Sequence, residues 1–481
     1  MSKYYVTIGL EMHCEGSETK SKVFSPAKNE YSETPNKNVV AIDMGFPGIL
    51  PTVNKEAVKM AIMMSYVLHA RIPEYMYFER KNYYYPDLPK GYQITQNPPE
   101  DCVGNGGYVD IEREDGSIFR VDIDNFHLEE DTARSTHINN ITAMDYNRAC
   151  APLFEMVTKP CIHSADDAVL FLEYIRNVYQ YCNISEADSK KGQIRCDVNV
   201  SISDDENTLG TKVEVKNVNS FSGVRDTINY EIKRQSDLKD EGRYNEVVQE
   251  TRRWDEETGT TISMRSKEDL EDYKYFVEPN IPKYKLDPKW LEEIKNSIPE
   301  LPNERKEKYK SVYGLSNYDA VILVKEKNVS DYFEECLKLG IDAKNASNWI
   351  TTRILGYINK EFISIDEIYL TPSMLKEIID MVNSNKISSK QAKDLFYAVL
   401  EDKKDPSVLV KELGMEQLSD DKELREIICK ILDENTDNIK KYKEGRTNIL
   451  GFFVGQTMKA TGGKANPTMA TDIIKEEIER R

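Results

Sequence analysis

Hydrophobic and polar residues alternate along residues 6–13. The hydrophobic positions are Val6, Ile8, Leu10 and Met12, and the positions between them are Thr7, Gly9, Glu11 and His13. A period of two predicts a strand with one buried face. Glu11 and His13 therefore project from the same face, and Gly9 leaves open space beside them. A carboxylate next to an imidazole either holds a divalent cation or forms a structural pair, and both interpretations remain open for this stretch alone.

The same alternation marks further strands. Residues 108–112 and 118–124 alternate around Asp115-Gly116, which predicts a hairpin, and the second arm continues into three consecutive acidic residues, 129–131. In that run Leu128 and Glu130 share one face, and Glu129 lies on the other. Residues 194–202 and 213–216 also alternate. If the loop between them closes a hairpin, their polar faces form one charged surface, which is either merely solvated or suited to a nucleotide or another phosphate-bearing ligand.

Glu155 stands inside the apolar run 152–157. An unpaired buried carboxylate is energetically costly, so Glu155 needs a partner or a raised pKa. A salt bridge to Arg148 is the structural interpretation, and a metal ion is the functional one.

The second half of the chain is predicted to be helical. Earlier helices are expected at about 54–69, after Ser164 and after Ser220 or Ser222, and prolines at 279, 282, 288, 299 and 302 mark a domain boundary. Amphipathic segments then continue to the end. The fold class is therefore α+β, with a mixed α/β part followed by all-helical parts.

Composition narrows the class of protein. The 481 residues carry a net charge of −18 and eight cysteines without a Cys-x-x-Cys pair. Neither a disulfide framework nor a zinc knuckle is indicated, which favours a reducing cytoplasm. No apolar run is long enough to cross a membrane, and the N-terminus lacks the apolar region of a secretory signal.

Such an acidic protein would have to bind nucleic acid locally rather than over its whole surface. Residues 440–470 are the candidate, because they contain six basic side chains and one acidic side chain, Glu444. The basic residues are Lys440, Lys441, Lys443, Arg446, Lys459 and Lys464.

Several long motifs together resemble a known family. They are Gly9 to His13, Lys81 to Gln93, Leu128 to Asp131, Asn147-Arg148, Pro152 to Glu155, Arg195 to Asp197, Gly210 to Phe221, Gln249 to Arg252, Met264 to Lys267, Asp272 to Pro279 and Met458 to Pro467. With these motifs the chain resembles, over essentially its whole length, the B subunits (GatB) of the aspartyl/glutamyl-tRNA(Asn/Gln) amidotransferases, the GatCAB heterotrimers.

The resemblance implies a fold and an activity. The fold would comprise a catalytic, kinase-like cradle domain at 1–292, a helical domain at 293–405 and a YqeY-like tRNA-binding tail at 406–481. The activity would be that of a cytoplasmic ligase that works with an amidase (A) subunit and a small C subunit. ATP and Mg²⁺ would serve to phosphorylate the side-chain carboxylate of misacylated Glu-tRNA(Gln) or Asp-tRNA(Asn), and ammonia from glutamine would then displace phosphate.

The resemblance also assigns residues. It implies metal ligands at Glu11, His13, Glu130 and Glu155, with Glu11, Glu130 and Glu155 as the catalytic group, and ATP-contacting residues stay unassigned. Because His is an unusual ligand for Mg²⁺, a transition metal is an alternative. Lys81 and Lys90 match positions near the ammonia route. Lys459 and Lys464 fall in the tRNA-binding tail.

Two other functions compete with this one. The first is a non-catalytic tRNA-binding paralogue with the same fold. The second is a stand-alone metal-dependent hydrolase. Departures from the family pattern lie near the proposed site, among them Cys150 in place of a common glycine and Lys190-Lys191 in place of two acidic residues. Whether Glu-tRNA, Asp-tRNA or both are substrates does not follow from the sequence.

Overall fold

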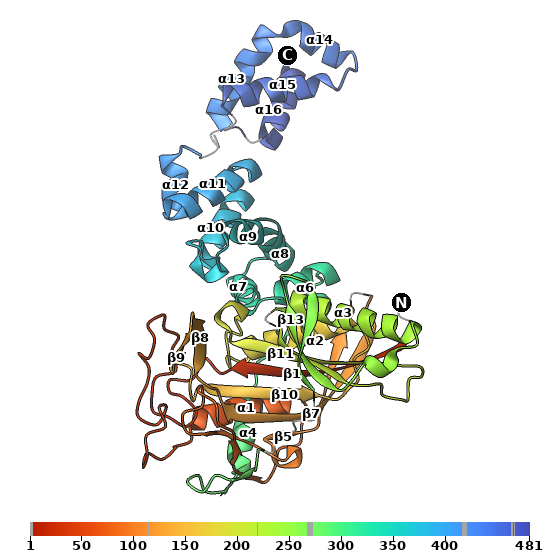
Figure 1. Ribbon diagram of the computed structural model, residues 1–481. Helices are drawn as coiled ribbons and strands as arrows, with labels where there is room; N and C mark the ends of the chain where they lie inside the picture. The colour runs from red at the N-terminus through yellow and green to blue at the C-terminus, as the bar shows by residue number, and fades with distance from the viewer. Residues whose placement is uncertain are drawn as a thin grey trace. The chain divides into compact units, whose positions relative to one another are not determined.

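The computed structural model describes residues 3–113, 115–218, 220–266, 273–415, 421–462, 465 and 467–481. The chain divides into two compact units, residues 1–304 and 305–481. Strands and three long helices build the first unit, whereas the described part of the second unit is helical (Figure 1). The predicted α+β fold class is therefore confirmed.

A mixed sheet forms the centre of the first unit (Figure 1). Within the described ranges it runs in the order β14-β13-β12-β11-β1-β10-β7-β5, with β6 on β7, and only β12 and β13 pair in parallel. The strands are β1 (Tyr5–Glu15), β5 (Gly104–Asn105), β6 (Tyr108–Glu112), β7 (Ile118–Glu130), β10 (Pro152–Thr158), β11 (Ile194–Ser203), β12 (Val213–Val218), β13 (Glu250–Asp255) and β14 (Thr260–Ser266).

The alternation at 6–13 explains why one face of β1 is buried. Its hydrophobic side chains, from Val6 to Met12, are buried in one cluster with residues of α1 (Lys55–Val67), α2 (Ala165–Tyr181) and α3 (Phe221–Asp240). The three helices begin after Asn54, Ser164 and Ser220, whose side chains accept hydrogen bonds from the first turn. The predicted hairpin of β6 and β7 and the antiparallel pairing of β11 with β12 are both present.

Smaller sheets flank the main one. A three-stranded sheet consists of β15 (Phe276–Val277), β3 (Glu79–Asn82) and β4 (Tyr92–Thr95). Two pairs, β2 (Tyr75–Met76) with β16 (Tyr284–Lys285) and β8 (Arg134–Ile138) with β9 (Ile141–Asp145), complete the strands of the described chain.

The second unit contains two separate buried clusters, one between Tyr309 and Val410 and one between Leu424 and Ile478. The longer helices are α5 (Pro302–Ser311), α6 (Asn317–Val324), α7 (Lys327–Lys338), α10 (Pro372–Asn383), α11 (Ser389–Asp402), α13 (Asp421–Glu434), α14 (Thr436–Lys443), α15 (Ile449–Ala460) and α16 (Pro467–Arg480). In the described ranges no helix is both long enough and apolar enough to cross a membrane.

The three-domain division stays a prediction, but the structure bears on where its boundaries fall. Position 292/293 lies inside α4 (Pro288–Asn296), whose Ile294 is buried in the core of the first unit. Position 405/406 precedes α12 (Pro406–Glu412), whose Leu409 and Val410 belong to the first helical cluster. Domain boundaries that leave the core of the first unit and the first helical cluster intact therefore fall near residue 304 and after Met415.

A buried ion pair ties β3 to the segment after β15. Arg80 donates from Nε and Nη2 to the two carboxylate oxygens of Glu278, at 2.5 and 3.1 Å, and Glu278 is fully buried. Burial alone would raise the pKa of Glu278, but hydrogen bonds from Arg80 and from the backbone N–H of Asn280 hold this pKa below its usual value.

We expect Glu278→Gln to lower the stability of the first unit by about 2–3 kcal/mol at pH 7, because the partly buried guanidinium of Arg80 loses its charged partner. Since the folded-state pKa is depressed, the stabilisation is complete above the unfolded carboxyl pKa of roughly 4.3 and is lost as pH falls through the folded value. Urea unfolding at pH 7 and at decreasing pH measures this. Glu74→Gln is the control, since Glu74 pairs with Lys285 in solvent. Equal losses in both variants would contradict the expectation.

Candidate metal centre

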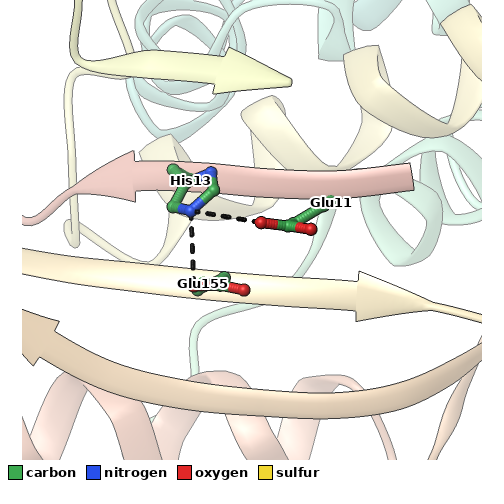
Figure 2. A group of neighbouring side chains, drawn as sticks. All are labelled: Glu11, His13 and Glu155. Atoms are coloured by element: carbon green, nitrogen blue, oxygen red, sulfur yellow. Dashed lines mark ion pairs between the residues drawn. The ribbon is translucent and has the colours of Figure 1, made fainter. Parts of the chain in front are cut away.

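Three neighbouring strands bring acidic and imidazole side chains together on one face of the main sheet. The register places His13 of β1 opposite Glu155 of β10, and Glu155 opposite His127 of β7. Nε2 of His13 lies 3.3 Å from Oε2 of Glu155 and 3.8 Å from Oε1 of Glu11. Figure 2 draws these three side chains and marks both pairs with dashed lines. Nε2 of His127 lies 3.1 Å from the same Glu155 oxygen and 3.7 Å from Oε2 of Glu129. Glu155 therefore links two overlapping groups.

The charges in this cluster stabilise one another. Burial alone would raise the pKa of Glu155, but the imidazoles of His127 and His13 hold it well below its ordinary range. Burial opposes protonation of His127, yet Glu155 and Glu129 raise its pKa well above the usual value. Burial and the neighbouring Glu155 raise the pKa of Glu11. The two imidazoles therefore balance the negative charge of Glu155 within a buried site.

The donor set fits a divalent cation. The ligand atoms of Glu11, His13 and Glu155 lie within 4.8 Å of one another, and so do those of His127, Glu129 and Glu155. Nδ1 of His13 is buried and has no hydrogen-bond partner within the described chain. Carboxylate oxygens suit Mg²⁺ and Mn²⁺, and two imidazoles shift the preference toward a transition metal.

The prediction that Glu130 converges with Glu11, His13 and Glu155 is wrong. Glu130 pairs with Pro152, so its side chain lies on the opposite, core-facing side of the sheet. There both carboxylate oxygens accept hydrogen bonds from Nζ of Lys90 at 2.5 Å, and the backbone N–H of Ile94 donates at 2.8 Å. The physical reason is the period of two: Glu130 follows Leu128 into the core, whereas Glu129 and His127 point to the other face.

His127 and Glu129 are the residues that the sequence analysis missed. The sequence pattern does indicate the position of Glu129, because alternation along 118–131 places it on the face opposite Leu128 and Glu130. The structural interpretation of Glu155, a salt bridge to Arg148, is also excluded. Nε of Arg148 pairs instead with Asp131 at 3.1 Å.

The two predicted channel lysines lie in different surroundings. Lys90 forms the buried pair with Glu130. The ammonium of Lys81 lies 4.9 Å from the ring centroid of Tyr273, and the carboxylates of Glu129 and Glu155 raise its pKa against the effect of burial. Lys81 therefore lies near the Glu155-centred cluster, whereas Lys90 lies against the core.

Cys150 adjoins the Lys90–Glu130 pair. Its backbone φ of +67° lies in the left-handed region, where a glycine is favoured. Burial, together with Glu130, raises the pKa of its thiol well above the ordinary value. The side chain therefore fills space beside the pair without providing a reactive thiolate.

A cavity of about 210 Å³ lies further along the same face of β1. Gly9, two positions before Glu11, lines it, and a Cβ at Gly9 would meet nothing closer than 3.9 Å. Polar side chains from β1, β11 and the following loop surround the space: Thr7, Asn199, Ser201 and Lys212. Next to Glu11, Lys216 of β12 pairs with Asp197 at 3.1 Å. The charged surface predicted for β11 and β12 therefore borders both the cavity and the cluster.

The predicted tRNA-binding lysines lie in the second unit. Lys459 is exposed near the end of α15, and Lys464 lies outside the described residues. The other cations of the basic segment, Lys440, Lys441, Lys443 and Arg446, are also exposed.

Comparison with known proteins gives a consistent result. A model of the GatB/GatE catalytic domain matches residues 6–292, and a model of the GatB domain matches residues 331–478. Proteins named as the B subunit of an aspartyl/glutamyl-tRNA(Asn/Gln) amidotransferase are similar over almost their full length. The one from Shouchella clausii is 43% identical over 98% of this chain and 99% of its own length. The one from Halalkalibacterium halodurans is 42% identical over 99% of this chain and all of its own length. The chain therefore belongs to the GatB family, the B subunits of the aspartyl/glutamyl-tRNA(Asn/Gln) amidotransferases.

Proposed function

We propose that this B subunit activates the side-chain carboxylate of Glu misattached to tRNA(Gln), of Asp misattached to tRNA(Asn), or of both. The γ-phosphoryl group of ATP is transferred to a carboxylate oxygen, which releases ADP. Ammonia then attacks the carbonyl carbon, phosphate leaves with the electrons of the broken C–O bond, and the product is an amide. The observation that carries the proposal is the Glu155-centred cluster, which lies on the same sheet face as a cavity in a chain of this family.

The need for this cluster follows from the chemistry. A carboxylate is a poor electrophile, and phosphorylation supplies its leaving group. Phosphoryl transfer depends chiefly on positioning and on stabilising negative charge. A bound divalent cation, Mg²⁺ in the first instance, supplies that charge when Glu11, His13, His127, Glu129 and Glu155 hold it.

The remaining polar residues on this face have complementary roles. The cavity along β1 accepts the base of the nucleotide, where Asn199, Ser201 and Lys212 supply hydrogen bonds and positive charge. Lys81 and Lys216 border the cluster and attract the anionic substrates toward it. The position of the cavity supports these roles. It lies on the same face of β1 as Glu11, so a nucleotide bound there would lie on the same sheet face as the Glu155-centred cluster.

Ammonia arrives from a separate amidase (A) subunit that acts on glutamine, and a small C subunit completes a cytoplasmic heterotrimer. Lys81 and Lys90 line its polar route. The Lys90–Glu130 pair supports this role for Lys90, since a buried charged pair beside the sheet provides fixed donors and acceptors in an apolar core.

Reconstitution with the two partner subunits tests the function. The proposal predicts ATP hydrolysis that misacylated tRNA stimulates and conversion of the attached Glu or Asp to its amide. Parallel assays with Glu-tRNA(Gln) and Asp-tRNA(Asn) identify the substrate. Tight tRNA binding without ATP hydrolysis would instead indicate a non-catalytic paralogue, and turnover by the isolated chain would indicate a hydrolase.

The basic segment 440–470 is proposed to bind tRNA through Lys459, Lys464 and their neighbours. We expect removal of residues 416–481 from the complex to weaken tRNA binding and to flatten its salt dependence by roughly 0.7 in log–log slope for each lost phosphate contact. This cut keeps Leu409 and Val410 in the first helical cluster. A salt titration of tRNA binding measures both effects, with the partner's glutaminase rate as the internal control. Identical affinities and slopes would assign tRNA recognition to the rest of the chain.

A further inference from the structure

A polar cavity of about 210 Å³ lies in the first helical cluster of the second unit, far along the chain from the catalytic residues. It is bounded by α8 (Ala343–Trp349), a π-helical turn (Ile350–Ile354), α10 and α11. Its wall includes one indole ring, one guanidinium, three side-chain amides and one hydroxyl: Trp349, Arg353, Asn345, Asn348, Asn383 and Ser389.

The polar groups of this wall are not used by the fold. Among the described residues, no hydrogen bond engages the side-chain amides of Asn345, Asn348 and Asn383, and no carboxylate pairs with Arg353. Another arginine of this unit does have such a partner, because Arg305 lies 2.6 Å from Asp331. The cavity therefore offers a bound ligand several hydrogen-bond donors and acceptors and one positive charge.

The aromatic side of the wall is held in place. The guanidinium of Arg353 lies over the indole of Trp349, 5.2 Å from the ring centroid. The other neighbour of Trp349 is Phe396 of α11, with ring centroids 6.0 Å apart. The π-helical turn that carries Arg353 also buries Ile350 and Ile354 in the core. Such turns are rare and are frequently found at functional sites.

These features match the chemistry of an unstacked nucleobase. Proteins hold extruded bases of RNA by stacking on aromatic rings or guanidinium planes and by hydrogen bonds to the base edges, which side-chain amides provide. The volume is below the roughly 300–1,000 Å³ typical of pockets for drug-sized ligands, so it suits one ring system rather than a whole cofactor. Lys390 and Lys393 of α11 follow the lining residues Ser389 and Ala392 in the sequence. Both lysines are exposed and have no ion-pair partner in the described chain. They are therefore available to contact phosphates.

We propose that this cavity binds one unstacked base of the tRNA, with Lys390 and Lys393 contacting the adjoining backbone. The proposal rests on the proposed function for the identity of the RNA. It adds a base-reading site in the helical cluster to the phosphate contacts of the tail.

The test uses the complete complex, a tRNA transcript and a series of NaCl concentrations. Asn348→Ala/Asn383→Ala changes two exposed side chains at the cavity and should weaken tRNA binding about tenfold without changing the salt slope, because no phosphate contact is lost. Lys390→Ala should weaken binding and lower the slope by roughly 0.7. Asn317→Ala, an exposed amide at the start of α6 outside the cavity, should bind as wild type.

The same variants separate this proposal from the proposed function. In Asn348→Ala/Asn383→Ala the KM for tRNA in amide formation should rise about tenfold, in line with the loss of affinity, while the melting temperature stays at the wild-type value. If the wild-type complex forms the amide and the double variant binds tRNA with wild-type affinity, the base-site proposal is overturned while the proposed function stands. If the double variant loses affinity but the wild-type complex never forms an amide, the base site stands and the proposed function fails. Competition for the cavity by a free nucleotide, with no effect of the variants on tRNA, would also overturn the base-site proposal.

Discussion

Glu155→Gln is expected to reduce tRNA-dependent amide formation by roughly a thousandfold, the upper end of the loss seen when one charge-stabilising group is removed from an active site. Glu155 is the residue that both cation-binding groups share, and its carboxylate lies within 3.3 Å of His13 and 3.1 Å of His127. A neutral amide of the same shape removes the central charge without opening a cavity. Amidation of misacylated tRNA by the reconstituted complex is the measurement.

The effect should be confined to the activation step. The glutaminase rate of the complex should stay at the wild-type level, because the proposed function assigns that reaction to another chain. Glu246→Gln removes an exposed carboxylate that pairs with Arg243, far along the chain from β10, and it should leave amidation unchanged. Wild-type amidation by Glu155→Gln would show that the cluster is structural.

The second large effect is expected from Lys90→Met. In this variant the fully buried carboxylate of Glu130 loses the ammonium that contacts both of its oxygens. We expect the free energy of unfolding to fall by about 3–5 kcal/mol as a result. The variant should therefore unfold at a markedly lower urea concentration. It should also lose glutamine-dependent amidation, because a buried polar group on the proposed ammonia route is gone.

A double variant separates these two consequences. Lys90→Met/Glu130→Leu replaces the buried pair by apolar side chains and should recover most of the stability, since such replacements are often neutral. If the pair serves ammonia transfer, glutamine-dependent amidation stays low while amidation from added ammonium chloride recovers. Full recovery of glutamine-dependent activity in the double variant would show that Lys90 and Glu130 only stabilise the fold.

Local pattern predicted much of this structure because side-chain direction in a strand follows directly from sequence parity. Alternation at 6–13 correctly placed Glu11 and His13 on one face, and the caps at Asn54, Ser164 and Ser220 marked three helices. The same parity argument separated Glu129 from Glu130. The family resemblance nevertheless assigned Glu130 to the metal site, and the register of β7 with β10 corrects that assignment.

Other features depend on long-range pairing and were therefore beyond a local pattern. That β1 lies between β10 and β11 is decided by contacts about 140 to 200 positions apart in the chain. This pairing gives Glu155 its two imidazole partners, one from each neighbouring strand, in place of the suspected Arg148. The cavity at Trp349 likewise requires three helices to pack and a π-helical turn to form between them.

The most direct test of the central claim measures phosphoryl transfer itself. The complex, supplied with misacylated tRNA and γ-labelled ATP but neither glutamine nor ammonia, is quenched rapidly, and label on the aminoacyl-tRNA is counted. The proposed mechanism predicts labelled aminoacyl-tRNA with the wild-type chain, its disappearance when ammonia is added, and almost none with Glu155→Gln. Equal labelling by wild type and Glu155→Gln, or amide formation without any ATP consumption, would contradict the assignment of this cluster as the centre of carboxylate activation.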